Sequence, residues 1–597
     1  MRRVLGAVLI AVLVTGCGGI PDHSGVVPRQ EIGRAPDEPQ VDVQPEVPTP
    51  GGTPAQIAAG FVYAHTGIDD RQSTAKEFLT PAAVKEWNPD QGIAVLRNGS
   101  LAVEQQGTQV TVTATVIATV SADGRMTQLV RPTASTLRLP LQRVSGEWRV
   151  SSVPHGLGLW LTSSSFDNLY QQRTIYYGAA NEQKVLVPDQ RWLPKRGSIT
   201  SMTKAVLSPP APWFTSSVRR SVPASTQLVG SVPVSSTGVA TISLSEDALL
   251  AAPQDRATLW AAMVETLKDI TQVSRVEITV NGAPFPAPGV SADALSADDI
   301  GYRVVAPAYQ SVIVRDADGL HWDDQRRNDI SRPQRGQPDL GDLPAIGTNW
   351  HWLAADGKTQ EIAGVSGDNR TVGRWIGGRL HQVPPFGRQL VRPAYDGVNG
   401  LWVAGQSLGT DNAAPGKPAA AAGPATIWVI NTRRPAVSVQ PEPIVVPGLE
   451  GKDIVSVAVA PDGQRAALVL RDRTTQATVV QVYGVVRDRD DQAVRLTTPR
   501  ALNASILAAS DVSWIDGTTV AVLGRVSSDP GVVQPVRVPL NDTAEALGAV
   551  PGAQQVVGGT ASQFSMAVIT NRNTIVTRRG SSWDAIAEGS DLVVPAP

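Results

Sequence analysis

The first folded stretch of the chain changes from a helical to a strand-like spacing of apolar residues. One face of a helix is predicted by Ile57, Phe61 and Ala64. Residues 74–77 match a capping box, which predicts that a further helix opens there. Apolar and polar residues then alternate strictly over 109–116, and shorter strands are predicted at 137–141 and 147–150. Helices followed by strands predict a small α+β domain over residues 53–165.

The next stretch has the pattern of a strand, a helix and a second strand. Strands are predicted at 239–244 and 275–280, and the second of them ends at an Asn-Gly turn. Between them, one apolar helix face is formed by Leu259, Met263, Leu267 and Ile270. A crossover of this length is typical of a βαβ unit with parallel strands. The pattern therefore predicts a second α+β domain over residues 166–300.

Beyond residue 300 no helical period remains, and short apolar runs recur with Asp-Gly turns. These turns lie at 318–319, 356–357, 396–397, 462–463 and 516–517. Their spacings of 38, 40, 66 and 54 residues are near the length of a propeller blade, with insertions such as the low-complexity segment 410–424. The pattern predicts a β-propeller over residues 301–597. An aperiodic pair of β-sandwiches remains the alternative at this point.

The amino terminus has the three parts of an export signal. Two arginines precede an apolar or Gly/Ala run of 11 residues, which is too short to span a membrane, and Val14-Thr15-Gly16-Cys17 follows. This ending resembles the lipobox of bacterial lipoproteins. We therefore expect a signal peptide over residues 1–16, cleavage between Gly16 and Cys17, and a diacylglyceryl thioether with an N-acyl chain on Cys17. Residues 17–52 would then form a proline-rich tether, since 18–52 contains seven prolines.

Composition narrows the possible functions. Of the 597 residues, 42% are hydrophobic and 18% are charged, as in globular proteins. The formal net charge of −2 gives no basic field of the kind that attracts nucleic acid, so we expect no nucleic-acid partner. A single cysteine excludes disulfides within the chain and Cys-based zinc sites.

In this order, the lipobox, tether, two α+β domains and propeller resemble the actinobacterial LpqB lipoprotein family. Within the second domain, 186–189, 239–244 and 276–282 are similar to the GerMN module of spore-germination proteins. The resemblance implies an accessory of the MtrA–MtrB two-component system, anchored by lipid to the extracytoplasmic face of the cell membrane. The implied partner is the extracytoplasmic domain of an MtrB-like sensor histidine kinase, and the implied outcome is modulation of envelope and cell-division signalling.

A search for catalytic motifs gives only isolated matches. Ser201 and Lys204 match the Ser-x-x-Lys of penicillin-binding enzymes, but the sequence has no Ser-Asp-Asn or Lys-Thr-Gly. Residues 405–409 match a nucleophile elbow, yet no histidine follows His381 to act as its base. Residues 316–319 resemble the start of a calcium loop, but Arg327 stands at its twelfth position, so a hairpin turn is expected instead.

None of the six histidines falls at a metal-ligand spacing. We therefore predict no catalytic, cofactor-binding or metal-binding residue, and a protein that is not an enzyme. A lipoprotein that binds carbohydrate or cell-wall fragments is an alternative if four tryptophans share one exposed face, namely Trp350, Trp352, Trp375 and Trp402. A cell-wall hydrolase with unrecognised acidic residues is a second alternative.

Overall fold

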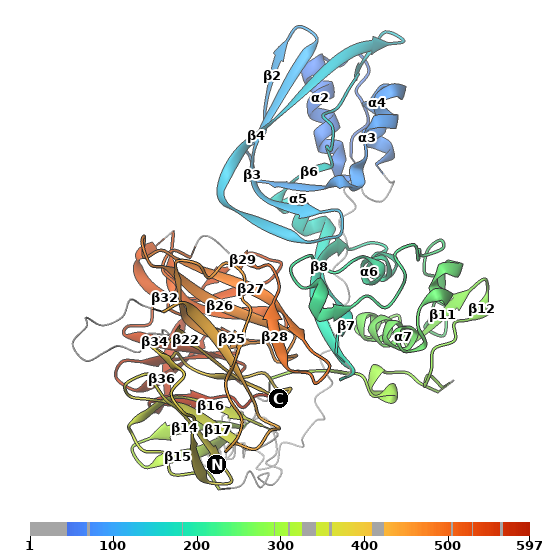
Figure 1. Cartoon of the computed structure of the whole chain (residues 1–597). Helices are drawn as coiled ribbons and strands as arrows, with labels where there is room; N and C mark the ends of the chain where they lie inside the picture. Colours follow the sequence, from blue (N-terminus) through green and yellow to red (C-terminus); the bar gives the residue numbers. More distant parts are fainter. Residues whose placement is uncertain are drawn as a thin grey trace, which may run out of the picture. The chain divides into compact units, whose positions relative to one another are not determined.

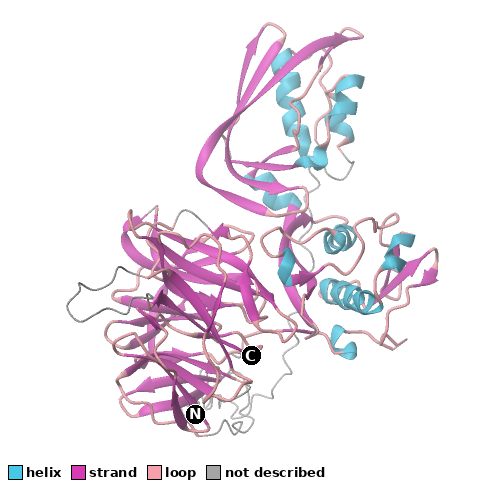
Figure 2. Ribbon diagram, viewed as in Figure 1, coloured by secondary structure: helices cyan, strands magenta, loops and turns pink. Residues whose placement is uncertain are grey.

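A computed structural model of the chain describes residues 45–597 apart from 68–71, 182, 292, 308–310, 325–341, 358–360, 409–422, 503–505, 528 and 561–564. Pro45–Pro597 forms one compact unit. The predicted signal peptide, Cys17, the cleavage site and most of the predicted tether lie outside the described residues. Helices occur in the first two modules, and the third is built of strands (Figures 1 and 2).

The N-terminal module packs short helices on one curved sheet. Its helices are α2 (Pro54–Tyr63), η1 (Ala64–Thr66), α3 (Ser73–Glu77), α4 (Pro81–Glu86) and η2 (Pro89–Gln91). The sheet order is β5-β4-β3-β1-β6 with β2 on β3, and the strands are β1 (Gly92–Leu96), β2 (Ala102–Gln106), β3 (Gln109–Ser121), β4 (Met126–Val144), β5 (Glu147–Val150) and β6 (Leu159–Thr162). Ile57 and Phe61 of α2 are buried in its core, as the spacing predicts.

The predicted capping box at 74–77 is wrong. The helix α3 begins at Ser73, so Thr74 is already inside it, and the helix ends at Glu77. The chain turns into this helix at Gln72, which has a left-handed φ of 62° and whose buried side chain donates to the carbonyl of His65. A capping box occurs instead at Thr53, whose hydroxyl accepts from the amide of Gln56 while the Gln56 side chain bonds back to Thr53.

The second module contains two sheets and three α-helices. The helices are α5 (Ser163–Leu169), α6 (Ser198–Leu207) and α7 (Pro253–Leu267), with 3₁₀ turns η3 (Thr215–Ser217), η4 (Glu246–Leu250) and η5 (Ala297–Ile300). One sheet has the order β13-β8-β7-β9, with β7 (Tyr170–Ala179), β8 (Val185–Pro194), β9 (Val218–Arg219) and β13 (Arg303–Val304). The other has the order β10-β11-β12, with β10 (Val239–Leu244), β11 (Arg275–Val280) and β12 (Ala283–Pro284).

Strands β10 and β11 are parallel, with α7 between them in the chain, so the predicted βαβ unit is confirmed. One helix and one sheet extend across the domain boundaries that the sequence predicts. Helix α5 runs across the predicted boundary at residues 165 and 166. Strand β13 lies beyond residue 300 yet pairs with β8, so the sheet of the second module extends past the predicted start of the propeller.

The third module is a β-propeller, as predicted, and the sandwich alternative is wrong. From Ser311 onward the described strands form six sheets, the blades. Blade 1 contains β38 (Asp591–Val593), β14 (Ser311–Asp316) and β15 (Gly319–Asp324), and blade 2 contains β16 (Trp350–Asp356), β17 (Glu361–Ser366), β18 (Val372–Ile376) and β19 (Arg379–Gln382). Blade 3 contains β20 (Gly387–Arg388), β21 (Ala394–Tyr395), β22 (Gly400–Ser407), β23 (Ala425–Asn431) and β24 (Glu442–Ile444).

The remaining blades follow in chain order. Blade 4 contains β25 (Lys452–Val459), β26 (Arg465–Asp472), β27 (Thr478–Arg487), β28 (Ala493–Leu496) and β29 (Arg500–Leu502). Blade 5 contains β30 (Asp511–Trp514), β31 (Thr519–Val526), β32 (Asp529–Pro539) and β33 (Glu545–Ala546). Blade 6 contains β34 (Ala553–Gly558), β35 (Met566–Thr570), β36 (Thr574–Arg579) and β37 (Ser582–Glu588).

The ring closes through blade 1, which combines strands from both ends of the module. Strand β38 pairs antiparallel with β14, and Ile313 lies opposite Val593. Arg315 of β14 forms a buried ion pair with Asp591 of β38 at 2.6 Å. The other blades are built from consecutive strands, so this pairing closes the ring. The segment after β38 adds a contact to blade 2, where Ala596 forms a parallel bridge with Asp356.

Candidate functional site

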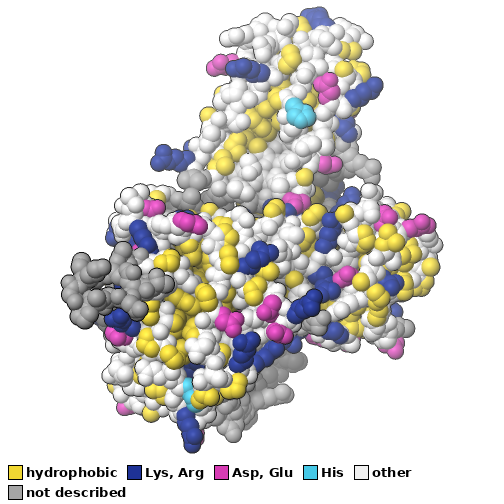
Figure 3. Space-filling model, in the orientation of Figure 1, with side chains coloured by type: hydrophobic (Ala, Val, Ile, Leu, Met, Phe, Trp, Pro, Cys, Tyr) yellow, Lys and Arg dark blue, Asp and Glu magenta, His cyan; other side chains and the backbone are white. Residues whose placement is uncertain are grey.

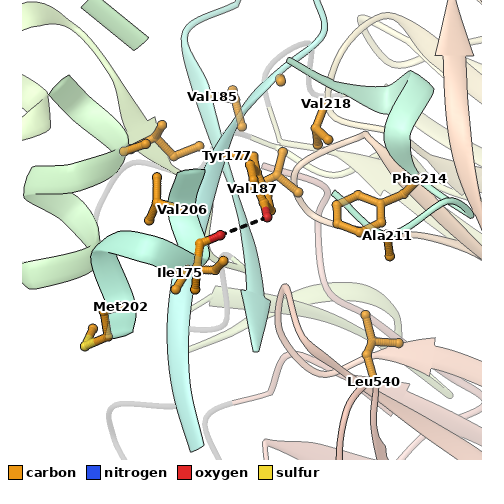
Figure 4. Close-up of a cluster of buried hydrophobic side chains, with 14 of the residues drawn as sticks. Ile175, Tyr177, Val185, Val187, Met202, Val206, Ala211, Phe214, Val218 and Leu540 are labelled. Atoms are coloured by element: carbon orange, nitrogen blue, oxygen red, sulfur yellow. Dashed lines mark hydrogen bonds between the residues drawn. The ribbon is translucent and has the colours of Figure 1, made fainter. Parts of the chain in front are cut away.

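A continuous apolar core joins the second module to the propeller. It contains Ile175, Tyr177 and Val187 from β7 and β8 together with Leu540 next to β32 (Figure 4). Tyr177 is 3% exposed, and its hydroxyl donates to the carbonyl of Ser208 at 3.2 Å. The two modules therefore share buried apolar surface, which is the main source of favourable free energy in protein association.

A polar network lies beside this apolar core, where all three modules meet. We call it the three-module junction and define it by Asp123, Arg125, Asp189, Arg191, Arg500 and Asn541. Strand β8 supplies Asp189 and Arg191, the turn between β3 and β4 supplies Asp123 and Arg125, and the propeller supplies Arg500 and Asn541.

Arg191 is the centre of the junction and is fully buried. Its Nε and one terminal nitrogen donate to the Asp189 carboxylate at 2.9 and 2.6 Å. The same terminal nitrogen donates to the hydroxyl of Tyr177 at 3.0 Å, and the other donates to the carbonyl of Asp123 at 2.7 Å. One guanidinium thus connects the second module to the N-terminal module and satisfies its own donors, as a buried charge requires.

Asn541 connects the same carboxylate to the propeller. Its side-chain amide donates to Asp189 at 3.0 Å and to the carbonyl of Gln190 at 2.8 Å. Its backbone carbonyl accepts from the indole of Trp192 at 3.0 Å, and its side-chain oxygen accepts from Arg500 at 2.8 Å. Because one asparagine bonds to three residues of β8 and to Arg500 of its own module, it fixes the position of the propeller against β8.

A second contact of β8 lies one residue earlier in the chain. Arg465, which is 1% exposed, donates to the carbonyl of Pro188 at 3.0 Å and also pairs with Asp462. The Arg465 guanidinium lies 5.5 Å from the ring centre of Trp514, which is a cation–π distance. A Cβ on Gly517 would lie 2.6 Å from the Pro188 ring, so the absence of a side chain there permits the close approach.

In the described part of the chain, the isolated motif matches do not have the local structure that their catalytic motifs require. Ser201 and Lys204 are one turn apart within α6, and Ser407 ends β22 rather than preceding a helix. The segment 316–319 is the expected hairpin turn, in which Asp316 lies opposite Gly319. Within the described part of the chain, no group of three or more His, Cys, Asp or Glu residues is arranged to hold a metal ion.

The four tryptophans that would favour a carbohydrate site do not share an exposed face. Trp350, Trp375 and Trp402 are 7%, 4% and 0% exposed, and Trp352 is half-buried against the core of blades 2 and 3. They act as blade filling, because a stacking site needs an accessible ring face. On the face drawn in Figure 3, basic and acidic side chains are interspersed. Among the described residues, no helix has the length and hydropathy needed to cross a bilayer.

The local sequence pattern does not predict the three-module junction. Asp189 and Arg191 flank Gln190 in a run, 185–193, whose other residues are apolar. Charged residues are rare on a buried strand. That contrast is the one local signal that this strand makes polar contacts inside the protein. Asn541 lies 352 residues from Asp189, and no local pattern links the two.

The fold defines the chain as a multimodular β-propeller protein with two α+β modules ahead of the propeller. The chain belongs to the LpqB lipoprotein family. It matches "Lipoprotein LpqB, N-terminal domain" over residues 47–167, "Sporulation and spore germination" over 174–285, and "Lipoprotein LpqB beta-propeller domain" over 337–596.

Relatives of similar length carry the same name. Lipoprotein LpqB of Streptomyces avermitilis is 25% identical over 98% of this chain and 96% of its own length. Lipoprotein LpqB of Streptomyces coelicolor is 25% identical over 100% of this chain and 98% of its own length. Among solved structures, the tandem GerMN domains of the sporulation protein GerM from Bacillus subtilis match at 18% identity and a TM-score of 0.19, covering 26% of this chain and 58% of that one.

Proposed function

We propose that this lipoprotein is an accessory of a sensor histidine kinase of the MtrB type, anchored by lipid at Cys17 on the extracytoplasmic face of the membrane. In this role it binds the extracytoplasmic domain of the kinase and carries out no chemistry of its own. The partner and the signalling outcome follow from the resemblance to the LpqB family. The tether after Cys17 would give the folded body reach above the bilayer.

The observation that carries the proposal is the three-module junction. Arg191 and Asn541 tie strand β8 to both neighbouring modules through buried hydrogen bonds. A body joined in this way presents its surfaces at fixed relative positions, which lowers the ordering cost of binding a large partner. Such a protein shifts signalling only if it binds one kinase conformation more tightly than the other, and about 1.4 kcal/mol of difference gives a tenfold shift.

A binding assay tests the proposal directly. The soluble body, residues 45–597, is titrated against the extracytoplasmic domain of the kinase by calorimetry, with a matched variant, Arg191→Met, that breaks the junction. We expect saturable binding of the unchanged body and weaker binding of the variant. Arg434→Gln is the control, since Arg434 is exposed on the propeller and its ion pair among the described residues is with the exposed Glu442. Absence of binding at high micromolar concentration would refute the proposal.

A further inference from the structure

An open cavity of about 680 Å³ lies beside the three-module junction. The N-terminal module contributes β1, the end of β3 and the segment 156–160 to its walls. The second module contributes 211–213, and the propeller contributes Arg500. Cavities of this size at the meeting of domains are frequent ligand sites.

Positive charge exceeds negative charge at the junction end of this cavity. Arg125 and Arg500 line it, and Asp123 stands beside them. Behind them lie Arg191 and Asp189. Arg125 and Arg191 pair with the two carboxylates, and Arg500 is a third guanidinium beside them. The surplus is carried by Arg500, whose hydrogen bonds to described residues go to neutral oxygens: the side chain of Asn541 at 2.8 Å and the carbonyl of Met126 at 3.3 Å.

Arg125 adds a donor that the described residues leave without a partner. Its terminal nitrogens bond to Asp123 and to the carbonyl of Pro209, whereas its buried Nε has no hydrogen-bond partner. Burial and then the nearby charge of Arg191 lower the pKa of Arg125 to about 10, so the group still carries its charge at neutral pH. An anion in the cavity would reduce the repulsion between these guanidinium groups.

The other walls of the cavity suit a small ligand that has both polar groups and an apolar side. Thr119, Ser121 and Thr127 bring hydroxyl groups, and Ile93 and Leu157 bring apolar surface. Part of the lining is the backbone of two glycines in close contact: a Cβ on Gly158 would lie 2.0 Å from the carbonyl oxygen of Gly92. Any larger residue at 158 would push the two segments apart and change the wall, so the cavity's shape depends on this pair.

We propose that this cavity binds a small organic anion about the size of a sugar that carries a carboxylate or a phosphate. Arg125 and Arg500 hold its charged group. Planar guanidinium groups recognise both kinds of anion through paired hydrogen bonds. Because one arginine comes from the N-terminal module and the other from the propeller, the bound anion joins these two modules. The proposal concerns a ligand of the body itself and does not depend on the kinase as partner.

Three matched sugars test the proposal on the soluble body, residues 45–597. Glucuronate carries a carboxylate, glucose 6-phosphate carries a phosphate, and glucose carries neither. We expect saturable calorimetric binding of at least one of the two anions and none of glucose at the same concentration. Binding of glucuronate alone identifies a carboxylate site, and binding of glucose 6-phosphate alone identifies a phosphate site.

Two variants locate the binding. Arg500→Gln is expected to weaken anion binding by about tenfold or more, since it removes a charged donor. Thr119→Trp fills the cavity from an exposed wall position without changing a charge, and should abolish binding even if Arg500→Gln fails to fold. Arg434→Gln, remote on the propeller surface, should bind normally. No binding of either anion at about 10 mM, or unchanged binding by both cavity variants, would overturn the proposal.

Discussion

The stability of the N-terminal module should fall in mild acid because of one buried histidine. His65 is 0% exposed, and its ring stacks on Trp87 at a centroid distance of 5.3 Å. Its Nδ1 accepts the backbone N–H of Trp160 at 3.0 Å, and its Nε2 has no partner among the described residues. Burial lowers the pKa of His65 from 6.5 to about 3, so the folded module holds this ring neutral.

The size of the effect follows from proton linkage. Since the unfolded chain binds a proton at a pKa of 6.5 and the folded module only near 3, the unfolded state gains protons first as the pH falls. Stability is therefore unaffected well above pH 6.5, declines below it, and reaches its full loss near pH 3. Between about pH 8 and about pH 5 this one group should remove about 2 kcal/mol from the free energy of local unfolding.

Hydrogen exchange resolved by peptide measures this loss in the intact soluble body. The opening free energy of amides in α2 and β6, corrected for intrinsic exchange, should fall by about 2 kcal/mol over that pH range. His65→Gln is the matched variant, because glutamine can accept from the Trp160 amide and does not titrate. An equal fall in His65→Gln, or no fall in the unchanged protein, would refute the reasoning.

Three further predictions address the anchor, the junction and the ring. Cys17→Ala should release the protein from the membrane fraction into the soluble fraction, and persistence in membranes would contradict lipidation. Arg191→Met removes the 2.6 Å ion pair of the buried Asp189 and leaves Arg125, at 3.9 Å, as a more distant cation, so the free energy of unfolding should fall by about 3 kcal/mol, measured by thermal denaturation beside Arg434→Gln. Deletion of residues 591–597 removes β38 from blade 1 and should expose the propeller to protease, whereas cleavage at the rate of the full body would show that the pairing with β14 is dispensable.

The elements that the sequence predicts well are those with local, regular patterns. Strands β10 and β11 are found at their predicted limits, since alternating residues face opposite sides of a sheet. Four Asp-Gly turns come early in their blades, at 356–357, 396–397, 462–463 and 516–517. In blades 2, 4 and 5 the turn comes at the end of the first strand or just after it, and in blade 3 it comes after the two short strands β20 and β21. The turn at 318–319 differs, because it joins β14 to β15 in a blade whose remaining strand is β38.

What the sequence leaves open depends on contacts between distant residues. The number of blades is not readable from the turns, because insertions change their spacing and β38 completes a blade that begins at Ser311. The junction is hidden for the same reason: Arg191 is locally one charged residue in a strand, and its role exists only when the β3–β4 turn and Asn541 reach it. Cys17 is the reverse case, since its predicted role needs nothing beyond the neighbouring residues.

Closure of the ring by β14 and β38 has a consequence for how the propeller folds. Arg315 and Ser590, which bond at this seam, are 275 residues apart in the chain. Bringing such distant segments together costs about 3 kcal/mol more chain entropy than closing a hairpin of about ten residues. The seam is therefore expected to form late, and until then β14 presents an unpaired edge that invites pairing with another chain. Newly synthesised molecules would be most prone to aggregate in that interval, and a chaperone that covers one strand edge would protect them.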